Sequence, residues 1–147
     1  MSLDNIPARE VMEQVITGVL DGFLGIPVQA GTEISRCTGA CVRIDIDGSW
    51  QGRIVVGASP GMLASICAAM FKTDSAQQDE VDQCDSLKEV ANILAGNIKA
   101  MLPAPSSLAI PEYLGTLTVA PLACVMRAVT DQNDILWLDL EEVNWTK

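Results

Sequence analysis

An Asp47-Gly48 pair between two runs of apolar residues restricts the fold of this 147-residue chain more than any other feature. The flanking apolar residues are Val42, Ile44, Ile46, Ile54, Val55 and Val56. An Asp-Gly pair between such runs is typical of a β-hairpin, because both residues tolerate the positive φ angles of a tight turn. The chain is therefore expected to contain an antiparallel sheet. Arg43, Asp45 and Asp47 alternate with the apolar positions, so we expect them on the solvated face of the hairpin.

Helical periodicity appears on both sides of the hairpin. Residues 7–24 are predicted to form a first helix that begins at Pro7, because apolar residues recur there at helical spacing. These residues are Val11, Val15, Ile16, Val19 and Phe23. A second helix is predicted up to about Phe71, with Ser59 as its N-cap and Pro60 in its first turn.

The third predicted helix separates two faces. It is expected to begin between residues 77 and 81 and to end at Met101 or Leu102, because Pro103 and Pro105 follow. With ~100° per residue, its apolar residues form one buried stripe. The stripe comprises Leu87, Val90, Ala91, Leu94, Ile98 and Met101. A sector of roughly 60° on the opposite face holds Asp85, Glu89, Asn92 and Gly96.

Any surface helix has a polar side, so this sector could simply be a solvated face without a function. Two of its residues favour a different interpretation. Asn92 is a mediocre helix former, and Gly96 costs ~1 kcal/mol relative to alanine in an exposed helix. A glycine on an exposed face is useful where another surface must come close. The sector is therefore a candidate binding surface.

Three further strands are predicted over residues 108–110, 116–129 and 135–140. The element order is then α-β-β-α-α-β-β-β. This order predicts an α+β fold, in which the helices pack on one face of an antiparallel sheet. We find no internal repeat and no linker, so residues 1–147 are expected to form a single domain.

Charge and composition exclude several classes of function. The net charge is −10, and an acidic surface repels nucleic acid and anionic membranes. The chain has no histidine, which removes the commonest proton-transfer group near neutral pH and the commonest zinc ligand. The longest mostly apolar run, residues 60–71, is too short to span a bilayer. Because no export leader is recognisable either, we expect a cytoplasmic protein without membrane contact.

The five cysteines are expected to be free thiols. An odd number without a recognisable leader is typical of a reducing compartment. Cys37 and Cys41 form a C-x3-C pair, whose spacing is neither that of a redox dithiol nor that of a zinc knuckle. A metal site built from the scattered cysteines stays an alternative, but the sequence predicts no metal site.

The third helix carries a recognisable motif. The string from Asp85 to Asn97 resembles the signature helix of the CheC/CheX/FliY chemotaxis phosphatases, whose pattern is an acidic residue or serine, three residues, Glu, two residues and Asn. Asp85, Glu89 and Asn92 match this pattern residue for residue. The Gly96-Asn97 pair and the Leu108-Ala-Ile-Pro111 string resemble the CheX branch in particular. The first helix offers Glu10-x-x-Glu13 without an asparagine, so the chain has one copy of the motif, which also favours CheX over CheC.

The resemblance implies a fold, a reaction and a partner. The fold would be CheX-like, and the activity would be that of a phosphatase (a hydrolase) in chemotaxis or two-component signalling. Its substrate would be the phosphoaspartate of a CheY-like response regulator. Asn92 would orient the attacking water, Glu89 would pair with a lysine of the regulator, and Asp85 and Gly96 would contribute to docking. The chain itself would bind no cofactor, since the regulator supplies Mg²⁺. The resemblance also implies a homodimer.

Three alternatives remain on the sequence alone. The same helix face could belong to a non-catalytic module that only binds a response regulator. A thiol enzyme would need an activated cysteine, and no histidine is present to activate one. A small-ligand binder could use the turn from Gly57 to Gly61, where a strand leads into a helix N-terminus and could attract an anion.

Overall fold

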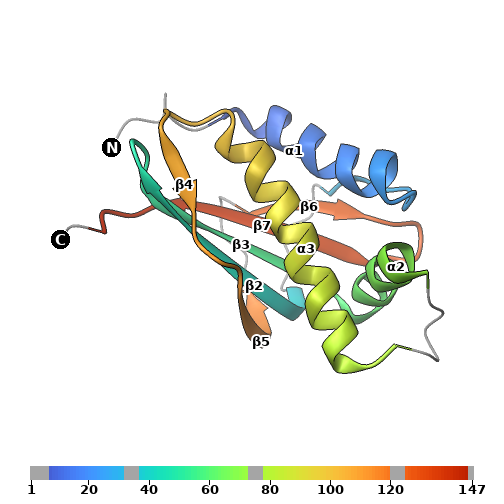
Figure 1. The fold of residues 1–147 in the computed structure, drawn as a ribbon. Coiled ribbons are helices and arrows are strands. Elements are labelled where there is room, and N and C mark those ends of the chain that lie inside the picture. Colours follow the sequence, from blue (N-terminus) through green and yellow to red (C-terminus); the bar gives the residue numbers. More distant parts are fainter. Residues whose placement is uncertain (1–6, 32–36, 73–77, 120–124, 146–147) are drawn as a thin grey trace.

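The fold is one antiparallel sheet with helices on one of its faces (Figure 1). The computed structural model describes residues 7–31, 37–72, 78–119 and 125–145. The helical elements are α1 (Arg9–Thr17), its continuation η2 (Gly18–Phe23), α2 (Pro60–Phe71) and α3 (Glu80–Lys99). In Figure 1, α3 crosses the sheet between α1 and α2. The predicted α+β class with an antiparallel sheet is confirmed.

The sheet has seven strands in the described parts of the chain. They are β1 (Gln29–Ala30), β2 (Cys37–Gly48), β3 (Gly52–Ala58), β4 (Ser106–Leu108), β5 (Glu112–Val119), β6 (Val125–Val129) and β7 (Ile135–Glu142). The spatial order is β1-β6-β7-β3-β2-β4, and β5 also pairs with β2. All these pairings are antiparallel. The long strand β2 therefore has β3 on one side and, on the other, first β5 and then β4.

The hairpin predicted from Asp47-Gly48 is confirmed. Strands β2 and β3 pair around Ile44 and Ile54, and Gly48 has the positive φ of +124° that favours glycine. The Asp47 carboxylate accepts hydrogen bonds from the Gly48 amide and from the Gln51 side chain, both at 2.8 Å. These bonds hold the turn in place, which fixes the register of the two strands.

The charged face of the hairpin is less solvated than expected. Asp47 is exposed, but Arg43 and Asp45 are half-buried and form an ion pair at 2.8 Å. The Trp145 ring lies against the guanidinium groups of Arg43 and Arg53, with 5.9 Å and 5.3 Å from ring centroid to Cζ. A C-terminal tryptophan thus covers part of this face, and the alternating pattern of the strand gave no sign of it.

The first helix is shorter than predicted and continues as a π-helical segment. Residues 9–17 are α-helical, and Gly18–Phe23 follow with wider turns. The residues that face the core are Met12, Ile16, Val19 and Leu20. Val11 and Phe23 are 40% and 65% exposed, so their expected place on the apolar face is wrong. A projection at 3.6 residues per turn misplaces Phe23, because the turns of a π-helix contain more residues.

Helix α2 has the predicted bounds, but the predicted capping by Ser59 is wrong. The Ser59 side chain makes no capping bond to α2; instead, its hydroxyl accepts a hydrogen bond from the Ile135 amide at 2.9 Å. Ser59 therefore joins the start of α2 to β7. The Asp134 carboxylate lies against Gly61, where a Cβ atom would collide with it. The N-terminal turn of α2 thus already has a carboxylate beside it.

Helix α3 begins within the predicted window. Asp79 is its N-cap, and its Oδ1 accepts a hydrogen bond from the Asp82 amide at 2.8 Å. Five of the six residues predicted to be buried are fully so, namely Leu87, Val90, Ala91, Leu94 and Ile98. Met101 was expected in the same stripe, but it is 38% exposed. The helix ends at Lys99, so the chain has left the helical path before it reaches Met101.

The strands after α3 differ from the prediction in their limits. The strand expected at residues 108–110 is largely wrong, because β4 covers Ser106–Leu108 and shares only Leu108 with it. The region 116–129 contains the end of β5 and all of β6, and residues 120–124 lie outside the described part of the chain. Gly115 has a φ of +83° at a register shift that leaves Leu114 without an opposite residue on β2. Such a bulge bends the strand and increases its local twist.

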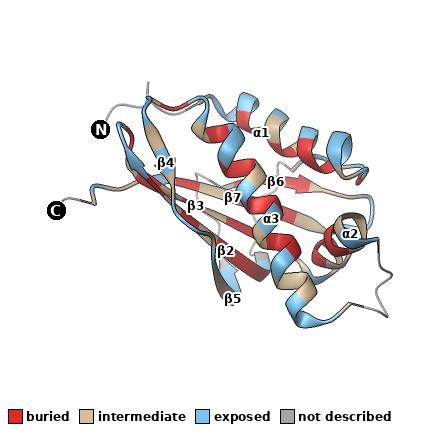
Figure 2. Ribbon diagram, viewed as in Figure 1, coloured by how far each residue is buried: buried red, intermediate tan, exposed pale blue. Residues whose placement is uncertain are grey.

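Most of the core lies between the sheet and the helices (Figure 2). A smaller cluster, centred on Cys41 and Trp137, lies on the other face of the sheet. No helix in the described ranges is both long and apolar enough to cross a membrane. The homodimer stays a prediction, because only one chain is described.

We expect truncation of Leu94 to destabilise the fold far more than truncation of Met101. Leu94→Ala leaves a cavity under α3 and should lower the free energy of unfolding by about 2–5 kcal/mol. Met101→Ala removes a partly exposed side chain and should change it by less than about 1 kcal/mol. Urea denaturation of the two variants measures both values. Equal losses would show that Met101 belongs to the core after all.

Candidate functional site

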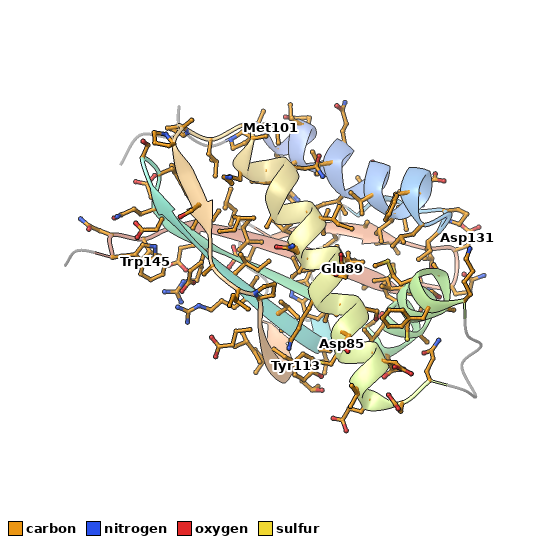
Figure 3. The ribbon with its side chains drawn as sticks, viewed as in Figure 1. Asp85, Glu89, Met101, Tyr113, Asp131 and Trp145 are labelled. Atoms are coloured by element: carbon orange, nitrogen blue, oxygen red, sulfur yellow. The ribbon has the colours of Figure 1, made fainter. Side chains whose placement is uncertain are left out.

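The exposed face of α3 carries the candidate site. The structure places Asp85, Glu89, Asn92 and Gly96 on this face, and all four are exposed. Figure 3 shows Asp85 and Glu89 along the side of α3 that points away from the sheet. The helix period explains this arrangement, because these four residues lie opposite the residues that pack on the sheet.

Several contacts hold α3 in one position. Its buried stripe packs on β2, and Lys99 in its last turn suits the negative end of the helix dipole. The Gln78 side chain, just before α3, donates a hydrogen bond to the carbonyl of Ala64 in α2 at 2.9 Å. Gln83 in turn donates to the Gln78 side-chain oxygen at 3.1 Å. The candidate residues therefore project from a rigid element that is fixed to its neighbours.

An open depression lies over this part of α3, with neighbouring elements contributing to it. It is lined by Met70, Phe71, Asp85, Lys88, Glu89, Asn92, Ile110 and Pro111. Met70 and Phe71 come from the end of α2, while Ile110 and Pro111 come from the segment between β4 and β5. Gly96 does not line the depression and lies one helical turn beyond Asn92.

The structure thus brings together residues that the sequence placed far apart. Pro111, which the CheX-like string had singled out, lies beside the same depression as Asp85, Glu89 and Asn92. Sequence reasoning missed Met70, Phe71, Lys88 and Ile110. For Ile110 a signal existed, because an isoleucine next to a proline at the end of a predicted strand has no obvious core position.

The polar side chains of the depression have no partner among the residues that the structure describes. Within the described parts of the chain, Asp85, Lys88, Glu89 and Asn92 form no side-chain hydrogen bond or ion pair. Asn97 on the same helix differs, because its side chain donates to the Ile93 carbonyl at 2.9 Å. The Asn92 amide therefore has both its donor and its acceptor available to a molecule outside the chain.

The structure limits two of the alternative sites. Among the described residues, no group of three or more His, Cys, Asp or Glu side chains could hold a metal ion. The turn from Gly57 to Gly61 is a poor anion site, because the Trp137 ring lies against Gly57 and the Asp134 carboxylate lies against Gly61. A negative charge at this helix N-terminus would repel an anionic ligand.

The described cysteines do not form a recognisable thiol centre. Cys41 and Cys67 are buried, and Cys84 is half-buried. Burial raises the pKa of the Cys41 thiol to about 11, against the opposite effect of a backbone hydrogen bond at Leu117. Cys41 is therefore protonated near neutral pH and is a poor nucleophile. Cys124 and the side chain of Cys37 lie outside the described residues.

One family model matches this chain. A family described as "Chemotaxis phosphatase CheX" matches residues 40–119, which is more than half of the chain. No curated protein sequence matches significantly.

Solved structures share the fold at low sequence identity. A CheC-like superfamily protein from Shewanella sp. PV-4 is 14% identical, with a TM-score of 0.73 over 98% of this chain and 100% of the other. The chemotaxis protein CheX from Vibrio vulnificus is 15% identical, with a TM-score of 0.71 over 92% and 99%. A CheX–CheY–BeF3–Mg²⁺ complex from Borrelia burgdorferi contains a chain that is 15% identical, with a TM-score of 0.71 over 95% and 99%.

Substituting Gly96 tests whether the fold requires a glycine at this position. A Cβ atom at this position would meet no other atom within 4 Å, and the residue is α-helical. Gly96→Ala should therefore raise the free energy of unfolding by about 0.5–1 kcal/mol, because alanine loses less backbone entropy in a helix. Chemical denaturation measures this change. A loss of stability would mean that Gly96 is needed by the fold and would remove it from the candidate binding surface.

Proposed function

Because the chain belongs to the CheX family of chemotaxis phosphatases, we propose that it hydrolyses the phosphoaspartate of a CheY-like response regulator. The observation that carries this proposal is the unengaged Asn92 amide beside Glu89 on the exposed face of α3. The CheX–CheY–BeF3–Mg²⁺ complex of a protein with the same fold supports a CheY-like partner.

The proposed reaction needs little from the chain itself. Water attacks the phosphorus atom of the acyl phosphate, the bond between phosphorus and the aspartate oxygen breaks, and the products are inorganic phosphate and a free carboxylate. Phosphoryl transfer depends mainly on positioning and electrostatic stabilisation. The response regulator supplies the metal ion and a lysine, so a chain without histidine can promote the reaction.

Asn92 is proposed to orient the attacking water. Its carboxamide can accept a hydrogen bond from the water and donate another, and it stays uncharged beside the phosphoryl group. Its position on a rigid helix limits the orientations that it can adopt. This restriction favours attack in line with the bond that breaks.

Glu89 is proposed to pair with the regulator's lysine. A carboxylate next to a phosphoryl group is repelled unless a cation lies between them, and the lysine is such a cation. Asp85 lies one turn before Glu89 and would add to the docking contacts. Gly96 lies one turn after Asn92, and because it has no side chain it would let the regulator approach the helix closely. The Mg²⁺ ion belongs to the regulator in this scheme.

Asn92→Ala should lower the stimulated rate of dephosphorylation by about 100-fold or more, because it removes the group that positions the water. Binding to the regulator should stay within a few-fold of the wild type. The decay of radiolabelled phosphorylated regulator, with and without the variant, measures the rate. Asn97→Ala is the matched control and should retain activity, since the Asn97 amide is bonded to its own helix. Full activity of Asn92→Ala would refute the mechanism, and a wild-type chain that binds without accelerating the decay would identify a binding module.

Glu89→Ala should weaken both binding and catalysis. Loss of one partner of a desolvated charge pair costs about 2–5 kcal/mol, so regulator affinity should fall about 30-fold or more. A double-mutant cycle with the regulator's lysine changed to alanine measures whether the two residues interact. If they do, the second substitution should add little to the first. Glu141→Ala, an exposed glutamate on β7, serves as the control, and additive effects in the cycle would disprove the proposed pair.

A further inference from the structure

Ile110 is the most exposed large apolar side chain in the described parts of the chain. It is 89% exposed, although burying an isoleucine is worth about 1.5–3 kcal/mol. Single exposed apolar residues are common on protein surfaces. Ile110 is not isolated, because Pro111, Met70 and the 42% exposed Phe71 line the same depression. The apolar residues come from the elements on both sides of α3 (Figure 1).

The backbone on both sides of Ile110 is fixed. The Ala109 amide donates a hydrogen bond to the Asp45 carbonyl at 2.8 Å, and Glu112 pairs with Arg43 at the start of β5. Pro111 has a restricted φ angle, which further limits the motion of the segment. Ile110 is therefore held outward on a short segment anchored to β2. An apolar group presented in this way binds a partner with little loss of conformational entropy.

We propose that Ile110, Pro111 and Phe71 form an apolar docking surface for the receiver domain of the phosphorylated response regulator. This inference rests on the proposed function and adds the residues that select the partner. The receiver domain would cover this surface with an apolar patch next to its phosphorylation site, while its lysine faces Glu89.

The apolar docking surface adjoins the polar residues of α3, and this indicates that the same receiver domain binds both. Asn92 can act on the attacking water only within hydrogen-bonding reach, about 3 Å, so the phosphorylation site must come close to α3. Asn92 and Ile110 line one depression, and a domain that reaches Asn92 therefore covers Ile110 as well. A specific interface buries roughly 800 Å² on each partner, which a few polar side chains on one helix cannot supply. The apolar residues on both sides of α3 provide the additional area.

Charge also favours a receiver domain over a second copy of this chain. The depression contains the carboxylates of Asp85 and Glu89 and the ammonium group of Lys88. Two copies facing each other would bring four carboxylates against only two Lys88 ammonium groups, between chains that each carry a net charge of −10. A receiver that presents a lysine instead complements the two carboxylates. Apolar contacts around this charge pair exclude water and strengthen it.

Ile110→Ser tests the docking surface. Because Ile110 touches no reacting atom in this scheme, its loss should raise KM about tenfold and leave kcat within about twofold. The conservative variant Ile110→Met should restore most of the affinity. Phe23→Ser is the matched control, since Phe23 is 65% exposed but does not line the depression. The substrates are the purified CheY-like receivers of the same organism, phosphorylated for kinetics or loaded with beryllofluoride and Mg²⁺ for measurement of Kd.

The outcomes separate this inference from the proposed function. An active wild type whose KM is the same after Ile110→Ser would overturn the docking surface and leave the phosphatase activity intact. An inactive wild type whose Kd for the beryllofluoride-loaded receiver still rises about tenfold on Ile110→Ser would overturn the activity and support the surface. If the substitution changes only self-association in sedimentation, the surface faces a second copy and the inference is wrong. Failure of every receiver to bind or to be dephosphorylated would overturn both.

Discussion

The packing of α3 on β2 is the interaction on which the site depends. The apolar stripe of α3, with Leu87, Leu94 and Ile98 at zero exposure, packs over the sheet and fixes the rotation of the helix about its axis. A rotation that exposed this stripe would lose several kcal/mol of apolar burial. The opposite face is therefore fixed as well, and it projects Glu89 and Asn92 away from the protein. The core thus sets the position of polar side chains that do not belong to it.

The length of β2 has a second consequence. β2 spans Cys37–Gly48, and on its outer side it pairs with two separate strands, β5 and the three-residue β4, rather than with one continuous strand. The chain leaves the regular ladder between them, and this break brings Ile110 and Pro111 next to α3. A continuous partner strand would instead place every residue at this edge in alternating positions above and below the sheet. Because of this interruption, Ile110 and Pro111 line one side of the depression, which α3 alone would not form.

Much of this architecture follows from local patterns in the sequence, and the exceptions have physical causes. Asp47-Gly48 predicted the hairpin, and the 3.6-residue period of α3 predicted both its buried stripe and the exposure of Asp85, Glu89, Asn92 and Gly96. The period failed for Phe23 and Met101, because a π-helical segment and a helix end change the path of the chain. The depression itself could not be predicted in full. Its lining joins residues 70–71, 85–92 and 110–111, and such proximity depends on long-range strand pairing, which local periodicity does not specify.

The polar residues of α3 and the apolar residues beside it have different tasks in the proposed complex. On the proposed mechanism, Asn92 and Glu89 meet a phosphoryl group and a lysine that any CheY-like receiver would present, so they cannot distinguish one receiver from another. Discrimination then depends on contacts outside the reacting centre. An apolar side chain such as Ile110 suits this task, because its binding energy depends on the shape of the opposing surface. Substitutions at Ile110 or Phe71 would change the choice of receiver while the water-positioning residues stay the same. Catalysis and partner choice would thus lie on separate elements, α3 for the first and its two flanks for the second.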